Sequence, residues 1–276
     1  MRGPAAEKGY VQAYLDLYHA AARKKYGQNF LIDDQIAKEI VDALPASEKT
    51  IEIGPGLGAL TYHLLQKGCP LTVVDLDPVM VEHLSLETNG EAIEIIHGDF
   101  LRYPLQKEKT PFSVIGNIPY YITAEMVEKL LKSQVSHLVL MVQKEAYERL
   151  KASKGSKDYG PLSIFCEYCG GSKLLRHVSR KAYFPEPHVD SVVFTMDVHK
   201  SRVAKDEKKF FEVTKRMFLL RRKTILNNLL QIVKDKEKAK QILADLKMDE
   251  RMRPEQLPLS FYLDLADYLT NQSPLS

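Results

Sequence analysis

Residues 112–120 read Phe-Ser-Val-Ile-Gly-Asn-Ile-Pro-Tyr, and this stretch decides the fold. Its first four residues form an apolar run that predicts a buried strand. Asn117 and Tyr120 follow where that strand ends, and Pro119 between them stiffens the turn. Ligands of open α/β sheets bind just outside the carboxyl ends of the strands. The corner therefore predicts a site where an amide, a backbone carbonyl and a ring face meet one flat, polar molecule.

The segments around this corner alternate between strand and helix patterns. Further strands are predicted at 50–54, 71–75, 92–96 and 137–142, and helix patterns cover 35–44 and the segment from the first glycines to Leu65. Another helical spacing of apolar residues runs up to Ala22. Strands that alternate with helices are typical of a parallel, doubly wound sheet.

Three of these strand ends carry residues suited to a nucleoside ligand. Gly54-Pro-Gly56-Leu-Gly58 joins the first strand to a helix, where a ligand can approach the backbone closely. Asp75 ends the next strand, at a distance from the glycines that suits an acid binding a ribose diol. Asp99-Phe100 offers an acid and a ring for an adenine amine and its face. The glycines alone would also fit an NAD enzyme, but Glu52 and the Asn117 corner argue against that class.

Composition indicates an ordinary globular chain with one basic segment. The 276 residues are 45% apolar and 27% charged, with a formal net charge of +3. No apolar run approaches the ~20 residues of a membrane span, and no secretory signal is visible, so a cytoplasmic protein is expected. Residues 201–225 hold nine basic and three acidic residues. Such a segment suits either a phosphate backbone or a solvated helix face. The apolar spacing over residues 210–230 predicts a single helix there.

The cysteines and histidines do not predict a metal site. Cys166-Glu-Tyr-Cys169 is a lone pair without the second pair that a zinc ribbon needs, so two buried thiols are expected. The eight histidines show no close pair with ligand spacing. We expect no metal and, since no spare apolar stripe stands out, a monomer.

Together these motifs resemble the class I S-adenosylmethionine-dependent rRNA adenine N6-dimethyltransferases, which include KsgA-type small-subunit enzymes and Erm-type resistance enzymes. The likeness extends from about Lys24 to Leu230. It rests on the stretches 27–31 (Gly-Gln-Asn-Phe-Leu), 52–58, 98–100, 117–120, 142–145, 154–163, 184–191 and 218–224 (Phe-Leu-Leu-Arg-Arg-Lys-Thr). The stretches 154–163 and 218–224 look more like the KsgA type.

The resemblance implies a fold, three segments and a substrate. The fold would be a class I methyltransferase Rossmann-like sheet with a small all-helical C-terminal domain. Residues 1–22 would form an extension, 23–200 the S-adenosylmethionine-binding domain and 201–276 an RNA-binding domain. The substrate would be two adjacent adenosines in the 3′-terminal hairpin of small-subunit (16S) rRNA, within an immature small ribosomal subunit.

The resemblance also implies residue roles. Cofactor contacts would come from Gln28, Asn29, Leu31, Glu52, Gly54, Gly56, Asp75, Leu76, Asp99, Phe100 and Asn117. The Asn117 side-chain oxygen and the Pro119 carbonyl would accept from the target amine, and Tyr120 would stack on the base. Phe184 would either cover the opposite face of the base or be a core aromatic between two prolines. RNA phosphates would bind Arg23, Lys24, Lys25, Arg216, Arg221, Arg222 and Lys223.

Two other readings share these features. An Erm-type enzyme acting on large-subunit rRNA, or a DNA adenine methylase, would have the same pocket and a different substrate grip. A ribosome-assembly factor would bind the immature small subunit, with methylation as a secondary activity.

Overall fold

The computed structural model describes residues 5–17, 28–68 and 70–271. The chain divides into two compact units, the first made of residues 1–147 and 172–198 and the second of residues 148–171 and 199–276. The predicted boundary after residue 200 lies close to this division, but residues 148–171 belong with the second unit. Aromatic packing explains the difference, because the Phe165 ring on α7 (Pro161–Tyr168) lies 4.6 Å from the Phe211 ring on α8 (Glu207–Met217).

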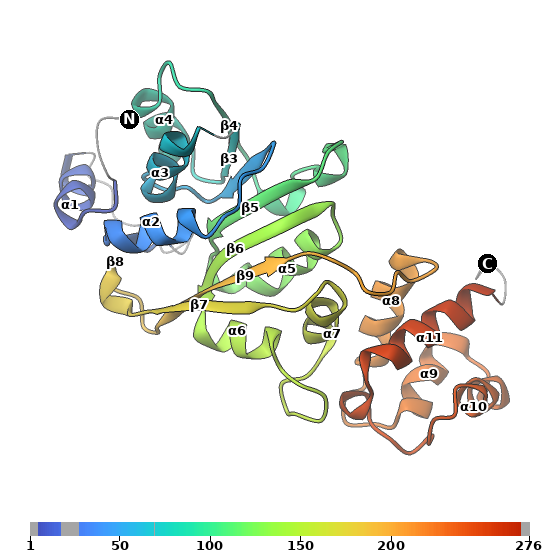
Figure 1. Ribbon diagram of the computed structural model, residues 1–276. Helices are drawn as coiled ribbons and strands as arrows, with labels where there is room; N and C mark the ends of the chain where they lie inside the picture. Colours follow the sequence, from blue (N-terminus) through green and yellow to red (C-terminus); the bar gives the residue numbers. More distant parts are fainter. Residues whose placement is uncertain (1–4, 18–27, 69, 272–276) are drawn as a thin grey trace. The chain divides into compact units, whose positions relative to one another are not determined.

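The first unit is built on a seven-stranded sheet in the order β4-β3-β2-β5-β6-β9-β7 (Figure 1). Its strands are β2 (Thr50–Ile53), β3 (Leu71–Asp75), β4 (Ile93–His97), β5 (Phe112–Asn117), β6 (Val135–Gln143), β7 (Lys173–Val178) and β9 (Ser191–Asp197). The predicted strands are β2 to β6, which pair with one another in parallel. The doubly wound sheet is therefore confirmed, with β9 added antiparallel between β6 and β7.

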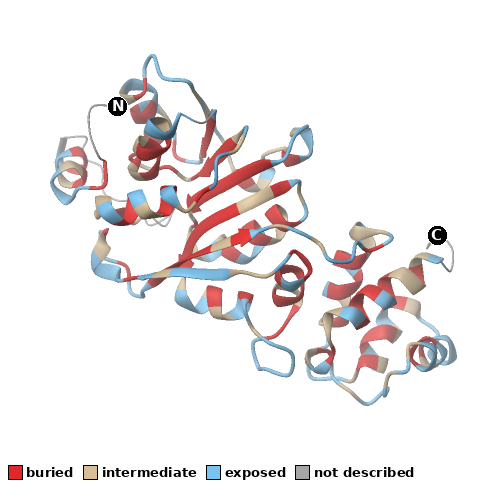
Figure 2. Cartoon of the chain, in the orientation of Figure 1, coloured by how far each residue is buried: buried red, intermediate tan, exposed pale blue. Residues whose placement is uncertain are grey.

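Helices cover both faces of this sheet (Figure 1). One core joins the sheet to α2 (Asp34–Asp42), α3 (Ala59–Lys67) and α4 (Pro78–Glu87). The opposite face is covered by α5 (Thr123–Leu131), which contacts β6, and the chain then passes into α6 (Lys144–Leu150). Burial follows this layering, because the central strands are mostly buried and the helices have one exposed side (Figure 2).

The N-terminal helical pattern forms α1 (Lys8–Leu17), while Tyr18 and Ala22 lie outside the described residues. A small apolar cluster joins Val11, Tyr14 and Leu15 of α1 to Phe30 and Leu57. Phe30 belongs to a two-stranded sheet in which β1 (Phe30–Leu31) pairs antiparallel with β8 (Tyr183–Phe184). Helix α1 is thus packed against the glycine loop, through Leu57, and against the small β1–β8 sheet.

The second unit is helical, as predicted for the C-terminal part. It contains α7, α8, α9 (Ile225–Val233), α10 (Lys236–Asp245) and α11 (Leu259–Asn271). The single helix expected over residues 210–230 is wrong, since α8 ends at Met217 and α9 begins at Ile225. Asn228 explains the break: its side chain accepts from Leu220 N (2.9 Å) and donates to Leu220 O (3.1 Å), which fixes a turn between the helices.

The described residues contain neither a helix that could span a membrane nor a cluster of metal ligands. Within residues 5–17, 28–68 and 70–271, no helix is long and apolar enough to cross a bilayer. The same ranges hold no group of three or more His, Cys, Asp or Glu side chains that could bind a metal ion. Cys166 and Cys169 are both buried and are not joined in a disulfide. Burial raises the pKa of Cys169 to about 12, so its thiol is unreactive near neutral pH.

The contact between β5 and β2 gives a direct test of the packing. A Cβ added to Gly116 would lie 2.6 Å from the carbonyl oxygen of Ile53, which is backbone and cannot turn aside. We expect Gly116→Ala to lower the free energy of unfolding by about 1–3 kcal/mol, the usual cost of overpacking. Urea denaturation measures the change. Gly98→Ala is the control, because nothing lies within 4 Å of its added Cβ; equal stabilities of the two variants would contradict the packing.

Candidate active site

A pocket opens at the carboxyl ends of the parallel strands, within the first unit. Its walls come from the loops after β2, β3, β4 and β5 and from the segment around β1. The predicted residues among its lining are Gln28, Asn29, Leu31, Glu52, Gly54, Gly56, Asp75, Leu76, Asp99, Phe100, Asn117, Pro119 and Tyr120. The structure therefore brings together every cofactor residue and three of the four catalytic residues that the sequence nominated.

The glycine loop turns back on itself directly after β2. Gly54 (φ +62°), Gly56 (φ +56°) and Gly58 (φ +90°) all adopt left-handed backbone angles that side chains disfavour. A Cβ on Gly56 would also lie 3.3 Å from the Phe30 ring. The loop ends where α3 begins, at Ala59, so its bare backbone and a helix N-terminus face the same pocket.

Asp75 holds this loop in place. Its Oδ2 accepts from Gly56 N (3.2 Å), and its Oδ1 accepts from Asp77 N (2.8 Å). Burial raises the pKa of the Asp75 carboxyl, and these two backbone bonds partly oppose the shift. Each oxygen keeps a second lone pair, so the carboxylate can bind the loop and still accept a hydroxyl from a ligand.

Glu52 lies deeper, on β2, and is almost fully buried. Its Oε2 accepts from Thr61 Oγ1 (2.7 Å) on α3. Burial raises the pKa of Glu52 to about 8, helped by the nearby Asp75 carboxyl and opposed by the Thr61 bond. An acid with this pKa is mostly protonated at neutral pH, and a cation placed beside it would favour its ionised form.

Asp99 and Phe100 form the wall after β4. Asp99 Oδ1 accepts from Leu101 N (2.9 Å), which caps a short 3₁₀ helix, η2 (Phe100–Arg102). The Phe100 ring is buried and stacks on Tyr103, with ring centroids 5.8 Å apart and planes 8° from parallel. Asp99 thus presents its second oxygen beside a fixed ring, an arrangement suited to an amine on a flat heterocycle.

The Asn117 corner faces the glycine loop. Asn117 Nδ2 donates to the carbonyl oxygen of Asn29 (3.4 Å), an orientation that leaves Oδ1 as an acceptor. The Pro119 carbonyl departs from prediction, because it already accepts from Ile122 N (3.2 Å) and Thr123 Oγ1 (3.3 Å) within the turn. The Ile122 bond uses one of its lone pairs, and the single Thr123 hydroxyl proton is shared between this carbonyl and Tyr120 O (3.4 Å). The Pro119 carbonyl is therefore engaged in the turn and is not the wholly free acceptor that the sequence suggested.

Tyr120 lines the pocket and is anchored by its hydroxyl, which lies 3.1 Å from Ser191 Oγ on β9. Partial burial raises the pKa of Tyr120, so the phenol stays neutral. Tyr121 also lines the pocket, with 62% of its surface exposed. Tyr121, Ile122 and Met126 line the pocket but were not predicted as site residues. The only sequence feature that points to them is their position directly after the Asn117 corner.

Two predicted contacts take other partners here. Gln28 Nε2 donates to Asp77 Oδ2 (2.7 Å), and Asp77 in turn caps α4. Phe184 is absent from the pocket lining; its half-buried ring packs with the α1 cluster, and Lys8 Nζ lies 5.7 Å from its centroid. This placement matches the alternative of a packed aromatic rather than a base-stacking one.

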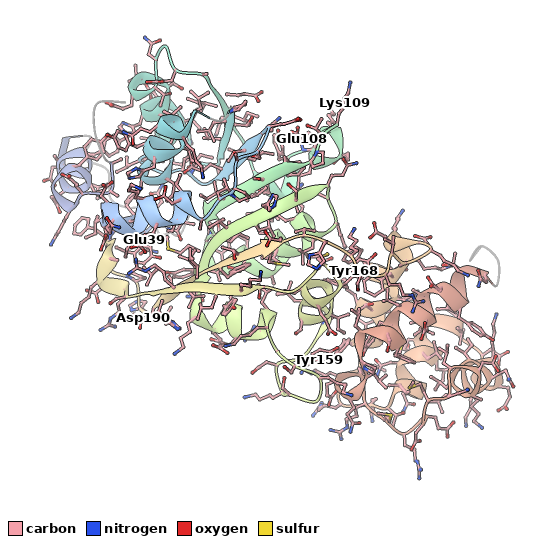
Figure 3. The ribbon with its side chains drawn as sticks, in the orientation of Figure 1. Glu39, Glu108, Lys109, Tyr159, Tyr168 and Asp190 are labelled. Carbon is pink, nitrogen blue, oxygen red and sulfur yellow. The ribbon has the colours of Figure 1, made fainter. Side chains whose placement is uncertain are left out.

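The predicted RNA-binding residues fall into three groups. Arg23, Lys24 and Lys25 lie outside the described residues. The guanidinium groups of Arg216 and Arg221 are hydrogen-bonded to backbone carbonyls. Arg216 donates to Gln231 O (2.8 Å), and Arg221 donates to the carbonyls of Lys157 and Tyr159. Arg222 and Lys223 are exposed in the turn between α8 and α9. Tyr159, whose carbonyl accepts from Arg221, is labelled in Figure 3.

Comparisons with known proteins agree with this geometry. The family described as ribosomal RNA adenine dimethylase matches residues 19–271. "Ribosomal RNA small subunit methyltransferase A" of Geobacillus thermodenitrificans is 37% identical over 98% of this chain and 98% of its own length. The protein of that name from Mycoplasma capricolum is 37% identical over 91% of this chain and 99% of its own.

Solved structures show the same fold. A dimethyladenosine transferase from Plasmodium falciparum has a TM-score of 0.71 and 25% identity, and covers 87% of this chain and 97% of its own. The 23S rRNA methyltransferase ErmE, at 22% identity, has a TM-score of 0.63 over 88% of this chain and 100% of its own.

The mostly parallel sheet and the pocket at its carboxyl edge define a class I methyltransferase. Within that class, the chain belongs to the ribosomal RNA adenine dimethylase family. It is accordingly an S-adenosylmethionine-dependent enzyme, and the pocket fits that cofactor. One cavity is lined by glycine backbone, the buried Glu52 on β2, the half-buried Asp75 on β3, and Asp99 beside the Phe100 ring.

The buried Glu52 predicts how stability depends on pH. Its pKa is raised from 4.5 in the unfolded chain to about 8, so the folded protein holds a proton that the unfolded chain has lost. The free energy of unfolding should therefore fall as pH rises between these values, by up to about 1.4 kcal/mol per pH unit. Glu52→Gln should reduce that slope in urea denaturation, whereas Glu48→Gln, at an exposed site, should not. If the free energy of unfolding of Glu52→Gln and of the wild type fell with pH at the same rate, the raised pKa of Glu52 would be refuted.

Proposed function

We propose that this enzyme transfers methyl groups to N6 of two adjacent adenosines in the 3′-terminal hairpin of small-subunit rRNA. It would act in the cytoplasm, as a monomer, on an immature small ribosomal subunit. The observation that carries the proposal is the Asn117 amide at the pocket mouth, opposite the glycine loop and beside Tyr120. The family and the names of the relatives support the substrate class.

The chain's own groups would bind and aim the reactants. S-adenosylmethionine supplies an electrophilic methyl carbon when bound. Gly54 and Gly56 would lie against its amino-acid end, Asp75 would accept from the ribose and Asp99 from the adenine amine. Asn29, Leu31 and Leu76 would close the remaining sides. Glu52 would stay neutral until the cofactor's charge lies nearby.

The target amine needs help because its lone pair is delocalised into the base. An acceptor on an N6–H draws that lone pair out of conjugation and points it at the methyl group. Asn117 Oδ1 would be that acceptor, and the bond from Asn117 Nδ2 to Asn29 O supports this orientation of the amide. The second acceptor would be the carbonyl of Ile118, since the neighbouring Pro119 carbonyl is used in its turn. Ile118 lines the pocket, and its amide is held by Met141 O at 2.9 Å.

The ring of Tyr120 would stack on the target base. Its hydroxyl bond to Ser191 fixes the ring, so little side-chain freedom is lost when a base binds. Stacking on an aromatic side chain is worth ~1–3 kcal/mol per base, and taking a base out of a helix costs a few kcal/mol. One ring therefore offsets part of that cost, and a target in a loop lowers the remainder.

The second unit would hold the rRNA backbone. Arg222 and Lys223 project from a turn fixed by Asn228, and cations in such positions bind phosphates without reading sequence. Arg221 would contribute by anchoring the 157–159 loop beside them, because its guanidinium is bonded to that loop's carbonyls.

Replacement of Asn117 tests the catalytic corner. We expect Asn117→Ala to keep its fold and lower the methylation rate by about 10²–10³, the typical effect of losing one positioned hydrogen-bonding group. Purified enzyme, labelled S-adenosylmethionine and immature small subunits from cells lacking this activity are mixed, and digested rRNA is read by mass spectrometry. Asn89→Ala, in an exposed turn, is the matched control and should retain activity.

The position of the label separates the alternatives. N6,N6-dimethyladenosine near the 3′ end of small-subunit rRNA supports the proposal. Label in large-subunit rRNA or DNA instead would keep the pocket chemistry and reject the substrate. Cofactor binding without any label would favour the assembly-factor reading.

The basic turn predicts a salt effect. Replacing Arg222 and Lys223 by Ala should weaken binding to immature small subunits and reduce the dependence of log K on log salt by about one for each phosphate that is no longer neutralised. Filter binding across a salt series measures this slope. Lys236→Ala/Lys238→Ala on α10 removes the same charge elsewhere, and an equal change there would reject a local role for the turn.

A further inference from the structure

Lys129 ties helix α5 to the loop that carries Asp99 and Phe100. Its Nζ donates to two backbone carbonyls at the end of that loop, Leu101 O (2.8 Å) and Tyr103 O (2.5 Å). The same nitrogen lies 5.9 Å from the centroid of the Phe100 ring. One ammonium group therefore contacts the backbone within η2 and directly after it, and lies over the ring that lines the pocket.

The helix that carries Lys129 is itself part of the pocket. It begins at Thr123, directly after the turn that contains the Asn117 corner, and its Met126 lines the cavity. A shift of α5 would therefore move the corner and, through Lys129, the Asp99 loop together. The two walls are joined by hydrogen bonds as well as by chain packing.

A second set of contacts also fixes the position of the Phe100 ring. Tyr103 stacks on it, and the Tyr103 hydroxyl donates to Glu108 Oε1 (2.8 Å). Glu108, labelled in Figure 3, is paired with Lys49 Nζ at 2.8 Å. Phe100 is thus fixed by a ring whose own position is held by an ion pair, while Lys129 fixes the backbone.

The charge on Lys129 suits this location. Partial burial lowers its pKa, and the Asp99 carboxylate opposes that shift. Two carbonyl oxygens and a ring face are groups that favour a cation. A neutral side chain of similar length would leave both carbonyls without this donor and would remove the charge of Lys129 from the surroundings of Asp99. The exposed Arg102, whose Nε lies 3.8 Å from Asp99 Oδ2, would remain.

We propose that Lys129 is a positioning residue for adenine recognition: it holds the Asp99 carboxylate and the Phe100 ring at the spacing that binds the adenine of the cofactor. This inference rests on the proposed function, in which the pocket binds S-adenosylmethionine. Lys129 does not touch the ligand. Its effect on ligand specificity passes through Asp99. The Asp99 carboxylate accepts a hydrogen bond from a 6-amino group and repels a 6-oxo group.

The test compares two ligands by isothermal titration calorimetry on the full chain. S-adenosylhomocysteine carries the 6-amino group, and S-inosylhomocysteine carries oxygen there. The variants are Lys129→Met, Lys129→Arg, which keeps charge and donors, and Asp99→Asn. Lys132→Met is the matched control, because Lys132 stands at the end of the same helix and pairs with Glu128 at 2.5 Å.

We expect Lys129→Met to lose about tenfold in affinity for S-adenosylhomocysteine and to lose most of the preference for it over S-inosylhomocysteine. Lys129→Arg should restore that preference, and Asp99→Asn combined with Lys129→Met should be little worse than Asp99→Asn alone. If Lys129→Met does not fold, Lys129→Gln, which keeps an N–H₂ donor, is measured in its place and should show an intermediate preference.

An unchanged preference in the Lys129 variants would overturn the inference, even with weaker overall binding, since a merely structural role lowers both affinities alike. Wild-type protein that binds neither ligand would overturn the proposed function first, and the inference with it.

Discussion

The parallel pairing of β2 with β5 is the constraint on which the site depends. Ile53 stands opposite Gly116 in this register, and the absence of a side chain at Gly116 lets the two backbones approach. Each strand ends immediately afterwards, so Gly54 and Asn117 emerge side by side; a Cβ on Gly54 would lie 3.9 Å from Asn117 O. The cofactor loop and the target corner are therefore neighbours because of one strand register, although they are far apart in sequence.

Side chains of the pocket serve the protein as well as a ligand. Asp99 caps η2, Asp77 caps α4 and accepts from Gln28, and Glu52 bonds Thr61. These bonds hold the walls before anything is bound, so little conformational entropy remains to be lost on binding. The cost is electrostatic: burial raises the pKa of Glu52 and of Asp75, and the Asp75 carboxyl adds to the shift at Glu52.

Local sequence patterns predicted the parallel strands because buried runs and glycine turns are short-range signals. The 71–75 strand and the Asn117 corner were placed correctly, and the pocket gathers the residues nominated on each strand end. β7 and β9 were missed, since the exposed residues of β7 show no alternation. The break after Met217 was missed because it depends on Asn228, whose role as a turn anchor is visible only in three dimensions.

The same limit applies within the site. Nothing in the order of residues shows that the Pro119 carbonyl is used by its own turn, that Phe184 packs beside α1, or that Lys129 reaches the Asp99 loop. Each of these contacts depends on how segments that are distant in sequence pack together in the fold. Motifs therefore identified which strand ends carry the chemistry, whereas the partners of individual atoms required the fold.

The bond from Asp75 to Gly56 has a consequence for how mutants of this site are interpreted. One carboxylate both shapes the glycine loop and faces the ligand, so a substitution there removes two interactions at once. A weakened cofactor affinity would not by itself identify a ribose contact, because a collapsed loop has the same effect. The two causes differ in the apo protein: loss of the loop bond exposes the amides of residues 54–58 to hydrogen exchange, whereas loss of a ligand contact does not.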